Sequence, residues 1–133
     1  MLAYVDTSAA LKLLVQEAES NALKRWLTDT KPALVTSSLL GVEMARTCLV
    51  RAPEKLGDAA NLAASVIRIP IGQTELDSAS LVRPDSIRSL DAIHLGTAIL
   101  LRASLDLFLT YDKRLADAAR FNGLRVISPG ADI

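Results

Sequence analysis

Two short runs of the chain are almost wholly apolar, and an acidic residue follows each of them. Residues 2–5 lead directly into Asp6, and residues 107–110 are followed two positions later by Asp112. Apolar runs of this length without polar alternation are typical of strands buried on both faces of a parallel sheet. The pattern therefore predicts two central strands, each with a carboxylate near its carboxyl end.

Segments with capping residues and helical spacing of apolar positions separate these strands. Ser8 is expected to cap a helix over residues 9–17, and Ser89 a strongly apolar helix over residues 90–102. The other predicted helices span about residues 20–28, 38–50, 53–66, 73–81 and 112–121, and the other strands about residues 34–36, 67–69 and 125–127. Strands that alternate with helices in this way indicate an α/β fold with a mostly parallel sheet.

Length and composition fit one self-sufficient domain over residues 1–133. Half of the residues are hydrophobic but only 4% are aromatic, so the core is expected to consist mainly of Leu, Ala, Val and Ile. The 15 basic and 15 acidic residues cancel. A dedicated nucleic-acid binder is usually basic, but a nuclease that gathers acids in one site would mask a basic rim. Zero net charge also favours self-association.

The chain shows no targeting or membrane-spanning pattern. Its first residues lack the basic start and long apolar segment of a signal peptide, and the apolar run near residues 98–101 is far too short to cross a bilayer. The single cysteine, Cys48, rules out an internal disulfide bond and fits a reducing compartment. We therefore expect a cytoplasmic protein without a membrane partner.

Four acids stand out by their positions. Asp6 and Asp112 follow predicted strands, and ligands of open α/β sheets bind at the carboxyl ends of strands. These two acids share one crevice if their strands are neighbours. Asp91 lies in the first turn of the most apolar helix, and Glu43 interrupts a largely apolar helix face. A carboxylate in such surroundings is costly unless something compensates its charge.

Each acid also has a structural interpretation. Asp91 can favour the helix dipole, Asp112 can be an N-cap, and Glu43 can pair with Arg46 one turn along. Asp6 is harder to explain in this way, because we assign it no capping role. Taken together, converging carboxylates repel one another, and a divalent cation removes that repulsion. All-oxygen ligands select hard ions such as Mg²⁺ or Mn²⁺, which activate water at phosphodiesters. One ion and two ions both remain open.

The motifs around these acids resemble those of the PIN domain, and specifically the VapC-type ribonuclease toxins of toxin–antitoxin pairs. The matching segments cover nearly the whole chain; they are Tyr4-Val-Asp6-Thr-Ser8, Ser37-Ser-Leu-Leu-Gly-Val-Glu43, Ser89-Leu-Asp91-Ala-Ile-His-Leu and Leu109-Thr-Tyr-Asp112-Lys-Arg-Leu. Each motif alone is weak, whereas all four in this order and at this length are specific.

The resemblance implies a Rossmann-like three-layer α/β/α sandwich and a Mg²⁺-dependent endoribonuclease. It places Asp6, Glu43, Asp91 and Asp112 on the family's acidic quartet, with Asp6 and Asp91 as the most direct metal ligands. It also implies a homodimer and a cognate VapB-type antitoxin. Such an antitoxin lays a C-terminal segment across the toxin and blocks the acidic site with a basic side chain. The RNA target stays open.

Several neighbouring residues are candidates for supporting roles. The hydroxyls of Thr7 and Ser8 can hold water or a phosphate, although Ser8 can also simply cap a helix. Thr110 can bond a site carboxylate, and the cations of Arg114 and Arg46 can contact the RNA backbone or sit on a solvated helix face. The only histidine, His94, is interpreted as a neutral core residue.

Other enzymes that begin with a strand-end acid fit less well. A phosphatase of the haloacid dehalogenase type needs a second Asp where Ser8 stands, and a receiver domain needs an acid pair near the first strand. No glycine-rich dinucleotide motif follows Val5. The main alternative is a non-catalytic PIN-like module that binds RNA or a partner protein. The complete set of four acids argues against it.

Overall fold

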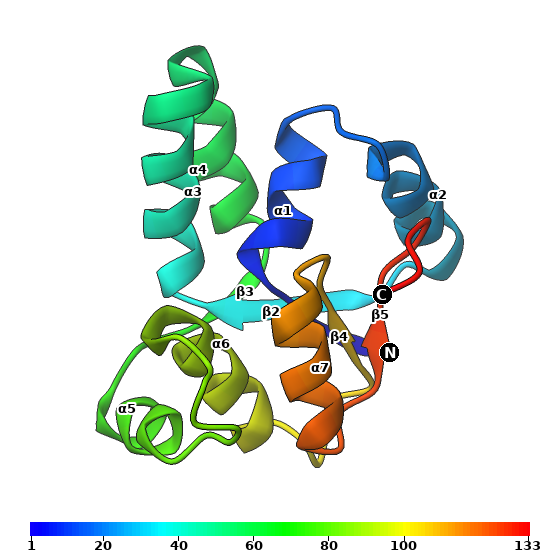
Figure 1. Cartoon of the computed structure of the whole chain (residues 1–133). Helices are drawn as coiled ribbons and strands as arrows, with labels where there is room; N and C mark the ends of the chain where they lie inside the picture. The colour runs from blue at the N-terminus through cyan, green and yellow to red at the C-terminus, as the bar shows by residue number, and fades with distance from the viewer.

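The first strand, β1 (Leu2–Val5), lies in the middle of a five-stranded sheet (Figure 1). The computed structural model describes all residues from 1 to 133. The strand order is β3-β2-β1-β4-β5, and every neighbouring pair is parallel. The remaining strands are β2 (Ala33–Ser37), β3 (Ile67–Ile69), β4 (Leu107–Leu109) and β5 (Val126–Ile127). The predicted sheet, expected to be mostly parallel, is therefore wholly parallel.

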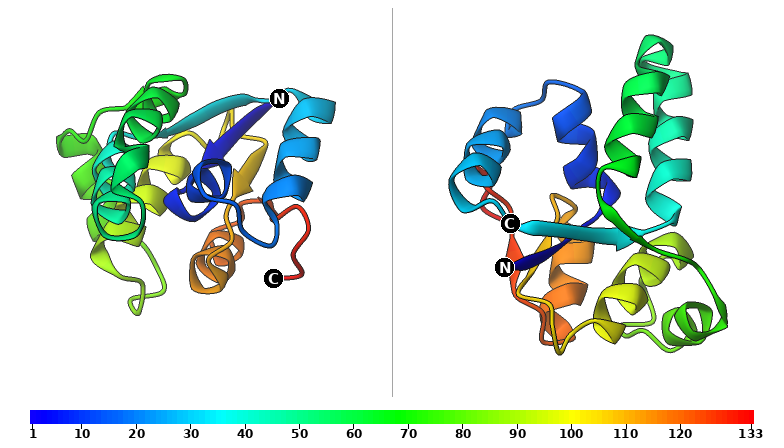
Figure 2. Two further views of the ribbon diagram at one scale, coloured as in Figure 1. Left: turned by 90° about the horizontal axis from the view of Figure 1, so that it is seen from above. Right: turned by 180° about the vertical axis from the view of Figure 1, so that it is seen from behind.

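Helices cover both faces of this sheet. They are α1 (Thr7–Leu14), α2 (Ser20–Thr30), α3 (Leu39–Arg51), α4 (Leu56–Ala64), α5 (Gln73–Ser80), α6 (Ser89–Leu100) and α7 (Lys113–Phe121). Helices α1 to α4 lie on one side, and α5 to α7 lie on the other (Figures 1 and 2). This arrangement confirms the predicted three-layer sandwich. No helix combines the length and the apolar content that a bilayer crossing requires.

Alternation along the two central strands divides the core into two parts. Val5 and Leu109 face the layer of α1 to α4, where they join the buried side chains of Leu23, Leu40 and Met44. Their neighbours Tyr4 and Phe108 face the opposite layer, and their rings stack with centroids 5.2 Å apart. Because both faces are covered, these strands read as continuous apolar runs in the sequence.

Three helix starts differ from the prediction. Asp6, not Ser8, is the N-cap of α1, and its side chain accepts from the backbone N–H of Ala9 at 3.0 Å. Ser8 lies inside the helix and donates its hydroxyl to Asp6 instead. Ser89 is likewise the first residue of α6 rather than its cap. The helix predicted over residues 53–66 begins as a separate 3₁₀ turn, Pro53–Lys55, which precedes α4.

Candidate active site

The direction in which the chain leaves the sheet reverses between β1 and β4. These strands are neighbours, with Val5 paired to Leu109. Asp6 and Asp112, which follow them, therefore lie at the same edge of the sheet, as the sequence required for a shared site. After β1 the chain enters α1 on one face, and after β4 it enters α7 on the other (Figure 1). Such a switch point opens a crevice at the carboxyl ends of the strands, where α/β proteins bind ligands.

Asp6 lies at this switch point, between β1 and α1, and is 3% exposed. Its Oδ1 accepts from Ser8 Oγ at 2.7 Å, in addition to the Ala9 amide, and its Oδ2 accepts from Thr110 Oγ1 at 2.7 Å. Burial raises the pKa of Asp6, and these hydrogen bonds offset only part of the rise. The predicted bond between Thr110 and a site carboxylate is thus present, and the claim that Asp6 has no capping role was wrong.

Glu43 enters the site from α3. Its Oε1 accepts from Thr7 Oγ1 at 2.6 Å and lies 2.6 Å from Nε2 of His94. Partial burial favours the neutral acid, but the hydrogen bonds from His94 and Thr7 outweigh it, so the pKa of Glu43 lies below its ordinary value. Arg46 forms no ion pair with Glu43, and the alternative explanation of Glu43 as half of a surface ion pair is wrong.

Asp112 and Asp91 belong to the first turns of two helices. Asp112 is the N-cap of α7, where its Oδ1 accepts from the amide of Leu115 at 3.0 Å. Asp91 receives no hydrogen bond. Burial raises the pKa of Asp91, and repulsion from Asp112 and from Glu43 raises it further. The carboxylates of α3, α6 and α7 therefore share one electrostatic environment, although they come from distant parts of the chain.

The residues fit a hard cation by their chemistry. Every donor is a carboxylate or hydroxyl oxygen, which is the set that Mg²⁺ and Mn²⁺ prefer. Asp91 has a raised pKa and no hydrogen-bond partner, so a cation would relieve a charge that the protein compensates only in part. As the side chains stand, however, no three of these groups converge tightly enough to hold an ion.

Other predicted site residues divide into two groups. Thr7, Ser8 and Thr110 each bond a carboxylate, so their hydroxyls orient the acids. Arg46 and Arg114 are exposed and bond none of the four acids.

Sequence analysis did not name Arg88, and it interpreted His94 as a core residue rather than as a contact of a site acid. Arg88 precedes α6, and its charge lowers the pKa of Asp91. His94 contacts Glu43, and its place one turn after Asp91 was the available signal.

Comparison with known proteins identifies the fold family. The family model described as the PIN domain matches residues 3–121. Ribonuclease VapC35 of Mycobacterium tuberculosis is 39% identical over 130 residues, which are 96% of this chain and 96% of that protein. The chain belongs to the PIN-domain family as a VapC-type ribonuclease. Ribonuclease VapC46 of the same species is 38% identical over 126 residues, covering 95% of this chain and 96% of the relative.

Solved structures support the same PIN fold. A toxin–antitoxin complex from Klebsiella pneumoniae matches with a TM-score of 0.74 and 20% identity, over 98% of this chain and 99% of that one. Mycobacterium tuberculosis VapC20, described as a sarcin–ricin loop cleaving toxin, matches with a TM-score of 0.66 and 23% identity, over 87% and 94% of the two chains. At these identities the structures establish the fold alone.

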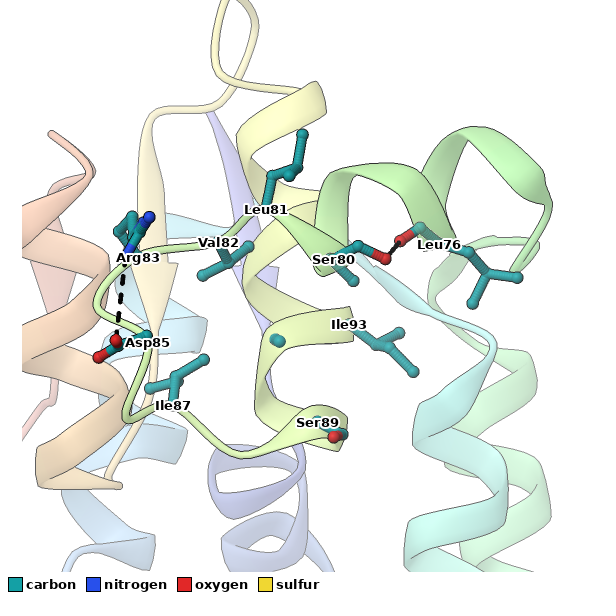
Figure 3. A pocket seen from close by; sticks show the side chains of 11 residues that line it. Leu76, Ser80, Leu81, Val82, Arg83, Asp85, Ile87, Ser89 and Ile93 are labelled. Atoms are coloured by element: carbon teal, nitrogen blue, oxygen red, sulfur yellow. Dashed lines mark hydrogen bonds and ion pairs between the residues drawn. The ribbon is translucent and has the colours of Figure 1, made fainter.

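Figure 3 shows a pocket of this PIN domain that is separate from the four acids by its lining residues. It measures about 550 Å³ and is enclosed by α5, the loop over residues 81–88 and the start of α6. Its apolar lining includes Leu76, Val82, Ile87 and Ile93, and none of the four acids lines it. The acidic site is therefore a feature of the open sheet edge and not of a deep cavity.

Proposed function

We propose that this VapC-type protein is a Mg²⁺-dependent endoribonuclease toxin, with Mn²⁺ as an alternative ion. The observation that carries the proposal is the electrostatic state of the crevice. Burial raises the pKa of Asp6, and burial together with Asp112 raises that of Asp91, at the switch point of the sheet. Folding disfavours the ionised forms of these two carboxylates, and a bound cation would compensate their charge.

Each acid has a distinct role in this proposal. Asp6, held by three hydrogen bonds, and Asp91, held by none, are the direct ligands. Glu43 and Asp112 each have one oxygen engaged by protein donors, and they complete the site directly or through water. When bound, Mg²⁺ lowers the pKa of a water and stabilises charge on the leaving oxygen of a phosphodiester.

The substrate is RNA, and its backbone must approach a rim of exposed cations. Arg114 follows Asp112 on α7, and Arg88 precedes α6 near Asp91. Both are exposed and available to phosphate oxygens. Arg46, which is exposed on α3, is assigned the same role. The positive rim positions the strand, while the acids act on one phosphodiester.

The proposed partners are a VapB-type antitoxin and a second copy of the chain. Support for an antitoxin comes from the similar solved structures, several of which are toxin–antitoxin complexes. Support for a homodimer comes from zero net charge and from exposed apolar side chains such as Leu81, which follows α5, and Leu90, in the first turn of α6. We place this system in the cytoplasm.

The test is RNA cleavage by the purified chain. Cleavage is expected with Mg²⁺ or Mn²⁺ and is expected to stop with EDTA. Asp6→Asn should abolish it, whereas Asp29→Asn, an exposed acid on α2, should leave it unchanged. Full-rate cleavage by Asp6→Asn would show that the site is misassigned. A wild-type protein that binds RNA but never cleaves it would support the non-catalytic alternative.

A further inference from the structure

A chain of buried hydrogen bonds connects the sheet core to Glu43. The hydroxyl of Tyr4 lies 2.7 Å from Nδ1 of His94, and Nε2 of His94 lies 2.6 Å from Oε1 of Glu43. Tyr4 is 0% exposed and His94 is 1% exposed, so water does not compete for these contacts. The chain links β1, α6 and α3, and it ends on an acid of the site.

The proton positions in this chain follow from its ends. The Tyr4 hydroxyl has one proton, which it can donate to Nδ1 of His94 at 2.7 Å. A carboxylate oxygen accepts, so Nε2 is the donor in the 2.6 Å contact with Oε1. Tyr4 itself is held between Phe108, on which it stacks, and the edge of the His94 ring at 5.8 Å. The core therefore selects one tautomer of His94.

Both donors to Glu43 converge on the same oxygen. Thr7 Oγ1 donates to Oε1 at 2.6 Å, and this hydroxyl also lies 3.2 Å from Nε2 of His94. No protein group bonds Oε2. The side chain of Glu43 is 22% exposed, so the carboxylate is partly accessible to solvent.

We propose that His94 is a positioning residue, which pins Oε1 of Glu43 so that Oε2 alone is presented to a cation. This inference rests on the proposed ribonuclease activity and assigns a role that core packing of His94 would not require. A histidine that serves only the core can satisfy each ring nitrogen with any nearby polar group, such as a backbone carbonyl. Here the partner of Nε2 is a site carboxylate that α3 supplies, and not a backbone carbonyl of its own layer.

Two amide substitutions separate positioning from packing. The nitrogen of glutamine reaches the place of Nε2, so His94→Gln keeps a donor for Glu43. His94→Asn keeps a polar group near Nδ1 but is too short to reach Glu43. We expect His94→Asn to weaken Mn²⁺ binding and to lower kcat by about 10–100-fold, the usual effect of losing an outer-shell partner. His94→Gln should stay within about threefold of wild type.

Mn²⁺ affinity is measured by calorimetry without RNA, so the readout does not depend on catalysis. Thr97→Val is the matched control, because Thr97 is equally buried on α6 and its hydroxyl bonds only the carbonyl of Ile93. This variant should lose stability but keep Mn²⁺ affinity and kcat. If His94→Asn falls no further than Thr97→Val in both measurements, His94 is a packing residue and the proposal is wrong.

His94 is the only histidine, so its ring signals in ¹H–¹⁵N NMR need no assignment. We expect Nε2 to be protonated and Nδ1 to be bare, as the contacts with Glu43 and Tyr4 require. Tyr4→Phe removes the donor to Nδ1 and should mix the tautomers. A spectrum with Nδ1 protonated in the wild type would overturn the inference. If the wild type neither binds Mn²⁺ nor cleaves RNA, the proposed function itself fails, which is a separate result.

Discussion

Thr110 donates its hydroxyl proton to Oδ2 of Asp6 at 2.7 Å, across the boundary between β4 and β1. The same hydroxyl oxygen accepts from the backbone N–H of Asp112 at 3.1 Å. One buried side chain thus connects two of the four site acids. It also joins the two strands at which the sheet topology reverses, so the position of the site and the integrity of the sheet centre depend on the same contact.

Replacing Thr110 tests this connection. Thr110→Val keeps the shape but removes the donor, which leaves a buried carboxylate oxygen without its partner. We expect a loss of about 1–3 kcal/mol in the free energy of unfolding and a fall of roughly 10–100-fold in RNA cleavage. Thr110→Ser retains the hydroxyl and should recover most of the activity. Equal activity in the Val and Ser variants would contradict the assigned role.

Asp91 should be a residue that costs stability in the metal-free protein. Burial raises its pKa, and Asp112 repels it, so Asp91→Asn removes an unfavourable charge. We expect the metal-free variant to melt about 1–3 °C above the wild type and to lose RNA cleavage. Thermal melting in EDTA measures the first effect. An unchanged or lower Tm would mean that Asp91 is compensated by the protein itself.

The stabilising effect of Mg²⁺ should grow with pH. Because folding raises the pKa of Asp6 and Asp91, their contribution to stability is fully present below the ordinary value of about 3.9 and declines as the pH rises through their raised values. Glu43, whose pKa folding lowers, contributes in the opposite sense. Mg²⁺ binds the ionised carboxylates, so the Tm increase in Mg²⁺ should be larger at about pH 8 than at about pH 5.

Matched KCl controls correct these melting curves for ionic strength. Asp91→Asn should flatten the pH dependence of the Mg²⁺ effect. A Tm increase that is the same at both pH values would show that Mg²⁺ does not act on these carboxylates.

Gly96 sets the distance between α5 and α6. A Cβ at this position would lie 2.7 Å from the backbone nitrogen of Ala79. Because that atom belongs to a helix backbone, α5 would have to move away from α6. Gly96→Ala should cost about 1–3 kcal/mol in urea unfolding and should lower activity, because α6 carries Asp91 and His94. Gly57→Ala in α4 meets nothing within 4 Å and should gain about 0.5–1 kcal/mol. If both substitutions destabilise the protein, the loss at Gly96 does not come from the contact between α5 and α6.

The sheet and the layers were predictable because their signals are local. Continuous apolar runs marked β1 and β4, and helical spacing marked the helices around them. The sequence could not show that β1 and β4 are neighbours, because the pairing of strands about 100 residues apart leaves no local pattern.

The contacts within the site were less predictable. Asp6 caps α1 through Oδ1 and accepts from Thr110 through Oδ2. Capping and a role in the candidate site are alternatives in the sequence, but the two oxygens of one carboxylate can fill both. His94 was read as core from its apolar helix, and it is indeed buried. That it reaches Glu43 depends on the crossing of α3 and α6, which no pattern within either helix encodes.

The central strand β1 is synthesised long before its neighbour β4. Asp6 and Thr110 are 104 residues apart, so a ribosome releases β1 long before β4 can pair with it. A product that stops before Leu107 would carry Asp6, Glu43 and Asp91 but would lack one wall of the crevice. Ribonuclease activity should therefore arise only after β4 has been synthesised and has paired with β1, and products that end before β4 should be inactive.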